Sequence, residues 1–313
     1  MKPAILLIGK NGQVGRELNS ALPRIGEVAA LDRQQLDLSQ PEEIRRAIRN
    51  FHPVFIVNAA AYTAVDKAES EEFVARAINA EAPAVMAEEA KKIGASLIHF
   101  STDYVFDGSK TTPYDEDDPT TPQNVYGRTK LEGERAIQAS GAAHLIFRTA
   151  WVYATQGRNF LLTILRLATQ HEELRIVRDQ IGAPTLNSEI AGATTNILAQ
   201  VCDTEGGPFS LANASGIYHM TAGGETTWYD FAKAILEEAT KTSAEYPWFA
   251  AATSSVPLIA RRVIPITANE YPTPARRPAY SVLSNARLNR TFSVRLPDWE
   301  KQLHSVFPNP PKK

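Results

Sequence analysis

The chain has 313 residues, of which 43% are hydrophobic and 22% are charged, and these proportions are typical of a soluble globular protein with one or two domains. Its formal net charge is -2 with no dominant basic stripe, so we expect neither a nucleic-acid partner nor an anionic membrane partner. The one cysteine, Cys202, excludes an internal disulfide and a thiolate metal cluster. No run approaches the ~20 apolar residues of a membrane helix, and the chain is expected to be cytoplasmic.

The first predicted strand, Ala4–Ile8, leads into a glycine-rich turn and then a helix at Arg16–Leu22. The turn has the spacing Gly-x-x-Gly-x-x-Gly over residues 9–15. Glycines permit the tight turn and let the backbone approach a pyrophosphate at the helix N-terminus. The alternative is a turn that only needs positive φ. The dinucleotide contacts predicted here are Gly9, Gly12, Gln13 and Val14.

The second predicted strand, Glu27–Leu31, ends in Asp32 and Arg33. An acidic residue at this point binds the ribose hydroxyls of NAD, whereas an arginine accommodates the 2′-phosphate of NADP. Both residue types are present, so the sequence does not choose between NADH and NADPH. The other coenzyme contacts that we predict are Asp37, Leu38, Ala59, Ala60, Ala61 and Tyr62.

Strands and helices continue to alternate through the first half of the chain. Further apolar strands are predicted at Val54–Val57, Ser96–Phe100 and His144–Arg148, with helical segments between them. This alternation predicts an α/β fold with a Rossmann-type, doubly wound parallel sheet. Such sheets bind ligands beyond the carboxyl ends of their strands, which would gather the glycine turn, residues 58–63 and residues 101–104 at one edge.

Tyr126 and Lys130 lie four residues apart in a predicted helix, Gln123–Ala139, and therefore share one helix face. A nearby ammonium lowers the pKa of a tyrosine hydroxyl, so the pair is suited to general acid or base catalysis. We expect Thr102, at the end of the fourth strand, to aim its hydroxyl at the same place. The alternatives are a packing tyrosine beside a solvated lysine, and a threonine that only caps a turn.

The regular alternation loosens after about residue 151. We therefore predict a Rossmann domain of residues 1–150 plus about 186–222, and a smaller α/β substrate domain of about 151–185 plus 223–313. Arg277 lies in a stiff, proline-flanked cationic loop that suits the diphosphate of a nucleotide sugar. A solvated basic loop is the alternative, and Arg158 is a second cationic candidate. Residues 241–280 carry no pattern that places their elements.

Several of these motifs together resemble the extended short-chain dehydrogenase/reductases and, within them, the dTDP-4-dehydrorhamnose reductase family. The resemblance covers residue 1 to about residue 300. The segments that carry it are Gly9–Gly15, Asn58–Ala61, Ala64–Glu69, Ser101–Gly108, Tyr126–Lys130, Arg148–Tyr153, Asp179–Thr185 and Gly216–His219.

The resemblance implies reduction of the C4 ketone of dTDP-6-deoxy-L-lyxo-4-hexulose to dTDP-L-rhamnose, a precursor of cell-surface polysaccharide. Tyr126 would donate the proton and contact the coenzyme, Lys130 would hold the nicotinamide ribose, and Thr102 would hydrogen-bond the same substrate oxygen. Substrate contacts would also come from Asp103, Tyr104 and Trp151. The related 4,6-dehydratases carry an Asp-Glu pair after this threonine, and since Tyr104 follows Asp103 here, elimination is disfavoured.

The resemblance also raises the question of a metal-bridged homodimer. Some family members hold magnesium with three glutamates, and this chain has Glu17, Glu189 and Glu300 in the matching segments. Carboxylates suit magnesium, but helix-surface glutamates are the alternative. Two other functions stay open at this point. One is a non-catalytic regulatory subunit resembling the β-subunit of methionine adenosyltransferase, and the other is a reductase of another nucleotide-linked 4-keto deoxysugar.

Overall fold

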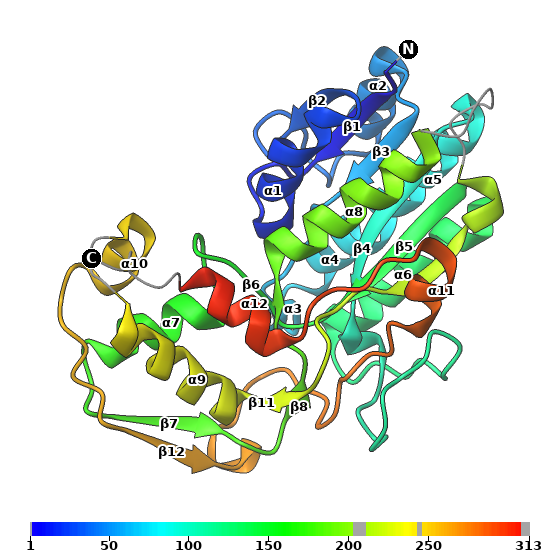
Figure 1. Cartoon of the computed structure of the whole chain (residues 1–313). Helices are drawn as coiled ribbons and strands as arrows, with labels where there is room; N and C mark the ends of the chain where they lie inside the picture. The colour runs from blue at the N-terminus through cyan, green and yellow to red at the C-terminus, as the bar shows by residue number, and fades with distance from the viewer. Residues whose placement is uncertain (1, 203–210, 243–245, 308–313) are drawn as a thin grey trace.

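The computed structural model describes residues 2–202, 211–242 and 246–307. Among these residues, the largest sheet has six parallel strands in the order β10-β5-β4-β3-β1-β2 (Figure 1). The chain moves outward from β1 in both directions, so its topology reverses between β1 and β3. The strands are β1 (Ala4–Ile8), β2 (Glu27–Leu31), β3 (Phe55–Asn58), β4 (Ser96–Thr102), β5 (Ala143–Thr149) and β10 (Gly216–His219).

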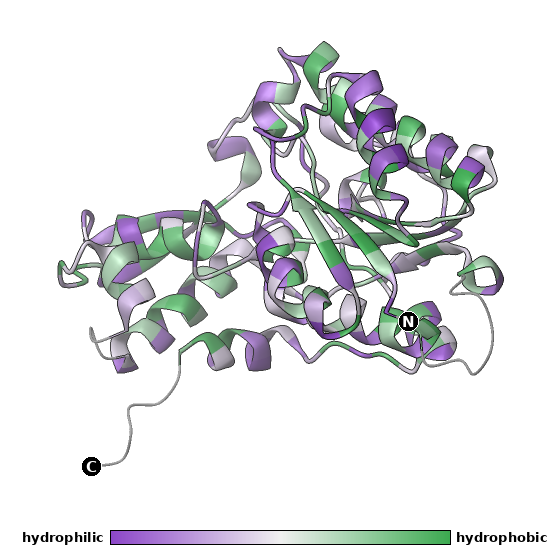
Figure 2. Ribbon diagram, turned by 90° about the horizontal axis from the view of Figure 1, so that it is seen from above, coloured by the Kyte–Doolittle hydropathy of each residue, from purple (hydrophilic) through white to green (hydrophobic). Residues whose placement is uncertain are grey.

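Helices cover both faces of this sheet because successive strand side chains point to opposite sides. Ile5 and Leu7 of β1 belong to one buried cluster, whereas Leu6 and Ile8 belong to another. Figure 2 shows the resulting apolar strands between helices of mixed polarity. The first cluster is covered by α1 (Gln13–Ala21), α8 (Asn187–Cys202) and α11 (Ala286–Phe292), and the second by α2 (Pro41–Phe51), α5 (Ala82–Ile93) and α6 (Val125–Ser140).

A further hydrophobic cluster, centred on the buried Phe231, lies away from the sheet. Its helices are α7 (Phe160–Ala168), α9 (Trp228–Lys241), α10 (Pro247–Thr253) and α12 (Trp299–Val306), beside the parallel strand pair β7 (Glu173–Val177) and β12 (Arg262–Ile266). Residues 241–280, which the sequence did not place, thus contribute α10 and β12. Our division into two domains with the stated boundaries remains a prediction.

Short elements connect these parts. Near the sheet they are η1 (Leu22–Arg24), α3 (Val65–Ala68), α4 (Glu72–Arg76), the π-helix η2 (Ala77–Glu81), η3 (Asp103–Val105) and η4 (Ala212–Ala214). Elsewhere they are β6 (Val152–Tyr153), β8 (Ile181–Gly182), β9 (Thr185–Leu186), β11 (Thr226–Thr227) and η5 (Ala268–Glu270).

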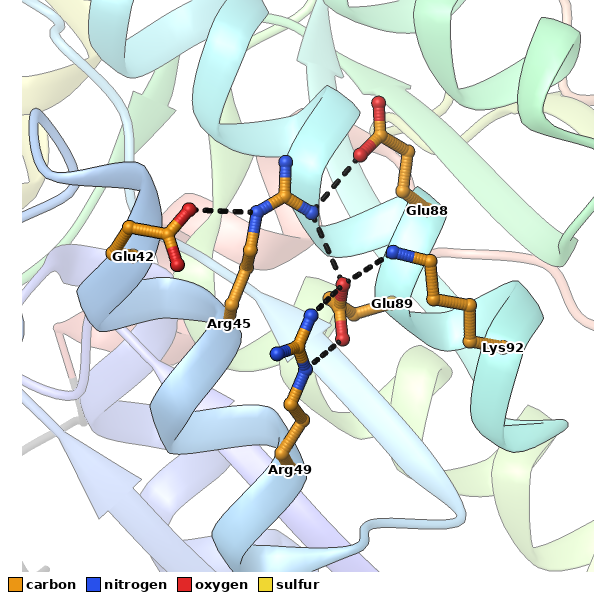
Figure 3. A network of polar contacts seen from close by, with 6 residues as sticks. All are labelled: Glu42, Arg45, Arg49, Glu88, Glu89 and Lys92. Carbon is orange, nitrogen blue, oxygen red and sulfur yellow. Dashed lines mark hydrogen bonds and ion pairs between the residues drawn. The ribbon is translucent and has the colours of Figure 1, made fainter.

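An ionic network joins α2 to α5 on the outer side of the sheet (Figure 3). The side chain of Glu89 is only 1% exposed, yet its oxygens accept hydrogen bonds from Arg49 at 2.7 Å, Lys92 at 2.8 Å and Arg45 at 3.0 Å. The hydrogen bond from Arg49 is the main cause that lowers the pKa of Glu89 to about 2, although burial opposes it. The network comprises Glu42, Arg45, Arg49, Glu88, Glu89 and Lys92.

We predict that Glu89→Gln lowers the free energy of unfolding at pH 7 by about 1–3 kcal/mol. Because the pKa of Glu89 is lowered in the folded state, its stabilisation is present above pH ~4.5 and is lost as the pH falls toward 2. Denaturant unfolding at pH 7, 4 and 3 should therefore show a flatter acid dependence in the variant. Glu88→Gln, whose side chain is 51% exposed, is the control; an equal effect from both variants would contradict this account.

Candidate active site

A cleft of about 820 Å³ lies at the carboxyl ends of the central strands, where the topology reverses. Loops after β1, β2, β3, β4 and β5 line it, together with α6 and the start of α9. The structure therefore gathers the residues that the sequence singled out from distant segments. Those lining the cleft are Gly9, Gly12, Gln13, Val14, Asp32, Arg33, Asp37, Leu38, Ala59, Ala60, Ala61, Tyr62, Thr102, Asp103, Tyr104, Tyr126, Lys130 and Trp151.

The glycine turn has a shape that only glycine allows. Gly9 has φ +89°, and a Cβ there would lie 2.7 Å from the amide nitrogen of Ala60. A Cβ on Gly15 would lie 2.0 Å from the carbonyl oxygen of Gly9. Helix α1 begins at Gln13 with no side-chain cap, so its first amides are available to an anion. This cradle fits the pyrophosphate of a nicotinamide dinucleotide.

The end of β2 presents one anion and nearby cations. Asp32 Oδ1 accepts hydrogen bonds from the amides of Gln34 and Gln35, and its Oδ2 lies 3.5 Å from Lys10 Nζ. Arg33 is exposed and also lines the cleft. The site thus holds an acceptor for ribose hydroxyls and cations for a 2′-phosphate, and the choice between NADH and NADPH stays open.

Thr102 and Tyr126 meet at the floor of the cleft. Their side chains interact, although Thr102 ends β4 and Tyr126 lies in the first turn of α6. Thr102 Oγ1 also donates to Asp103 Oδ1 at 3.0 Å and accepts from the amide of Tyr104 at 3.2 Å. Thr102 therefore caps η3, as the structural alternative held, and also contacts the candidate proton donor.

The environment of Tyr126 differs from the prediction in one respect. Burial raises its pKa to about 12, and the interaction with Thr102 offsets this only in part. Lys130 is not among the causes of this shift, and its Nζ lies 2.6 Å from the carbonyl oxygen of Phe100 and 3.0 Å from His99 Nε2. The prediction that Lys130 would lower this pKa is wrong for this structure. Tyr126 keeps its proton at neutral pH, which is the form a proton donor needs.

The second arginine of the proline-flanked loop has an acidic partner within the chain, and its contact with a substrate diphosphate stays a prediction. The guanidinium of Arg277 pairs with the carboxylate of Asp66 at 2.8 and 3.1 Å, and Arg277 is not among the residues that line the cleft. This ion pair joins two residues that are 211 positions apart in the sequence. Arg158 does line the cleft, is exposed, and makes no ion pair among the described residues.

Two indoles form one wall of the cleft. Trp151 has φ +47° and stacks on Trp228, with ring centroids 3.4 Å apart and an interplanar angle of 5°. Both line the cleft, and Gly182 packs so closely on Trp151 that a Cβ would lie 2.4 Å from the ring. Trp228 was not predicted as a site residue, because its position at the start of an amphipathic helix indicates only packing.

Comparison with known proteins assigns the family. A family model described as "RmlD substrate binding domain" matches residues 1–309. A dTDP-4-dehydrorhamnose reductase of Burkholderia thailandensis is 47% identical over 94% of this chain and 95% of the relative. The Escherichia coli K12 protein of the same name is 44% identical over 97% and 98%. The chain belongs to the dTDP-4-dehydrorhamnose reductase family.

Solved structures of the family confirm the predicted fold. The dTDP-4-dehydrorhamnose reductase of Clostridium acetobutylicum is 35% identical, with a TM-score of 0.84 over 96% of this chain and 97% of that one. The enzyme of Bacillus anthracis, solved in complex with NADP, is 31% identical, with a TM-score of 0.84 over 98% and 99%. The Rossmann-type sheet and the family resemblance are both confirmed.

The proposed magnesium ligands of this family member do not form a site within the chain. Glu17 lines the cleft, Glu189 lies in the first turn of α8, and Glu300 lies in the first turn of α12. No group of three or more metal-ligating side chains that could hold a metal occurs in the described part of the chain. Within the same residues, no helix is long and apolar enough to cross a membrane.

We predict that Asp103→Asn stabilises the protein at pH 8 by about 1–3 kcal/mol. Burial raises the pKa of Asp103 to about 6, from an ordinary 3.8. The folded state therefore binds the proton more tightly, and the stability from this group is lost as the pH rises from about 4 through 6. Unfolding free energies at pH 5 and pH 8 should differ less in the variant; an unchanged difference would contradict the burial argument.

Proposed function

We propose that this protein reduces the C4 ketone of dTDP-6-deoxy-L-lyxo-4-hexulose to dTDP-L-rhamnose with NADPH or NADH. The observation that carries the proposal is the contact between Tyr126 and Thr102 in a cleft that also contains the glycine turn. The substrate assignment is supported by relatives named dTDP-4-dehydrorhamnose reductase that match almost the whole chain. Because Thr102, Tyr126 and Lys130 are all in the cleft, catalysis is favoured over a purely regulatory role.

The cleft contains groups for each part of the coenzyme. The amides at the start of α1 would bind the pyrophosphate, and Asp32 and Arg33 the adenosine ribose with or without its phosphate. When bound, the nicotinamide supplies the hydride for C4. The NADP complex of the Bacillus anthracis relative supports the phosphorylated coenzyme. A magnesium-bridged homodimer remains a prediction from the resemblance alone.

Tyr126 supplies the proton that balances hydride addition. As negative charge develops on the C4 oxygen, the Tyr126 hydroxyl donates its proton there and becomes a phenolate. The Thr102 hydroxyl, which donates to Asp103 in this structure, would turn to donate to the substrate oxygen and so stabilise the developing charge. Trp151 and Trp228 provide an apolar wall against which a sugar ring can pack.

We predict that Tyr126→Phe lowers kcat by about 10²–10⁴-fold, because the proton donor is lost. Coenzyme affinity should stay within about threefold of that of the unaltered protein. The measurement is steady-state reduction of thymidine- and uridine-linked 4-keto sugars with NADPH and NADH, which also identifies the sugar and the preferred coenzyme.

The control for this experiment is Tyr153→Phe, a buried tyrosine whose hydroxyl has no hydrogen-bond partner among the described residues. It should retain turnover, since the altered group does not line the cleft. Full activity in Tyr126→Phe would reject its assignment as the proton donor.

We also predict that Arg158 binds a diphosphate in the cleft. Arg158→Ala should raise the KM of the nucleotide sugar or of the coenzyme, whichever diphosphate it contacts, by about 5–30-fold, while Arg158→Lys keeps part of the interaction. Arg277→Ala should instead lower the melting temperature, because Asp66 loses its guanidinium partner and keeps only the amide of Ala275. Unchanged KM values for both ligands in Arg158→Ala would refute this role.

A further inference from the structure

A buried polar chain connects β3 to α6 beneath the cleft. Asn58, His99 and Lys130 are each no more than 1% exposed. Asn58 Nδ2 lies 3.0 Å from His99 Nδ1, and His99 Nε2 lies 3.0 Å from Lys130 Nζ. The same Nζ lies 2.6 Å from the carbonyl oxygen of Phe100. Neither Asn58 nor His99 lines the cleft, so they act through the lysine.

The orientation of the Asn58 amide is set by the backbone. Its Oδ1 accepts a hydrogen bond from the amide nitrogen of Ala60 at 3.2 Å. If the side-chain amide were turned over, its NH₂ group would oppose that N–H, and two donors would face each other in a buried place. The NH₂ group therefore faces His99, and His99 Nδ1 must be the acceptor.

The tautomer of His99 follows from this contact. Burial is the largest cause that holds the pKa of His99 well below its ordinary value, so the ring is neutral. A neutral imidazole carries one proton. Since Nδ1 accepts from Asn58, the proton lies on Nε2, and this N–H points at Lys130 Nζ.

The charge state of the lysine is therefore constrained by its neighbours. An ammonium has three donors and no acceptor, so it would oppose the N–H of His99. A neutral amine can accept that N–H with its lone pair and still donate to the carbonyl oxygen of Phe100. The other charge facing Lys130 is that of Glu134 on the same helix, and its carboxylate is paired at 2.7 Å with Arg148 of β5.

We propose that Asn58 and His99 are positioning residues that present an N–H donor to Lys130 and thereby favour its neutral amine over the ammonium. Burial is the largest cause that lowers the pKa of Lys130 to about 8, and Glu134 opposes it. The consequence for catalysis rests on the proposed function: a lysine that holds the nicotinamide ribose as an ammonium would lose that charge close to neutral pH.

The test is nitrogen-15 NMR of the histidines in the full chain, which contains six of them. The His99 signals are assigned from their loss in His99→Gln. We expect Nε2 to be protonated and Nδ1 bare from pH 6 to 9, with no titration near 6.5. A ring protonated at Nδ1, or one that titrates near 6.5, would overturn the proposal.

Asn58→Asp provides the sharper comparison because it is isosteric and keeps the acceptor for Ala60. The added carboxylate oxygen accepts from Nδ1–H, so the tautomer should reverse and a lone pair should face Lys130. The pKa of Lys130, measured from the carbon-13 shift of its Cε, should then rise by at least one unit. An unchanged tautomer or an unchanged lysine titration would overturn the proposal.

His99→Gln is the conservative counterpart, since its side-chain amide can still donate near the position of Nε2. The Lys130 titration should stay within about half a unit of that of the unaltered protein, and a larger upward shift would count against the donor role. If Asn58→Asp fails to fold, the tautomer of His99 in the unaltered protein still tests the proposal. None of these measurements depends on turnover. They can therefore support the proposal even if the protein has no reductase activity.

Discussion

Helix α6 is fixed on the sheet by three polar side chains on one face. These residues are spaced four positions apart and are Tyr126, Lys130 and Glu134. Each contacts a strand of the sheet. Tyr126 contacts Thr102, Lys130 donates to the backbone of β4, and Glu134 pairs with Arg148. An unpaired buried charge costs several kcal/mol, so a helix rotated away from these partners is strongly disfavoured. The same contacts that set the rotation of α6 place the tyrosine hydroxyl at the floor of the cleft.

Much of this arrangement could be predicted because its signals are local. The apolar run before the glycine turn gave β1 as observed, and the four-residue spacing placed Tyr126 and Lys130 on one face. The helix itself begins at Val125 and not at Gln123, because Asn124 caps it by accepting from the amide of Gly127. The parallel sheet then followed from the alternation of strands and helices.

What could not be predicted depends on contacts between distant segments. Arg277 meets Asp66 only because the fold brings the proline-flanked loop against α3, so the loop alone suggested a free cation. The partner of Lys130 was hidden for a related reason. His99 lies inside an apolar strand, where a single polar residue is more often a packed core residue than part of a site. Its contact with the site becomes apparent only from the positions of Asn58 and Lys130 in the fold.

Burial raises the pKa of a carboxylate both in the cleft and outside it, but the neighbouring groups decide the outcome. At Glu89, three cations outweigh desolvation, so the pKa falls and the carboxylate stabilises the fold. At Asp103, desolvation outweighs the hydrogen bonds from its neighbours, so the pKa rises and the charge destabilises the fold. The same desolvation keeps Tyr126 protonated and brings the titration of Lys130 toward neutral pH. Supplying cations around Asp103, as around Glu89, would stabilise the fold, but it would also favour the phenolate of Tyr126 and thus remove the proton that reduction requires.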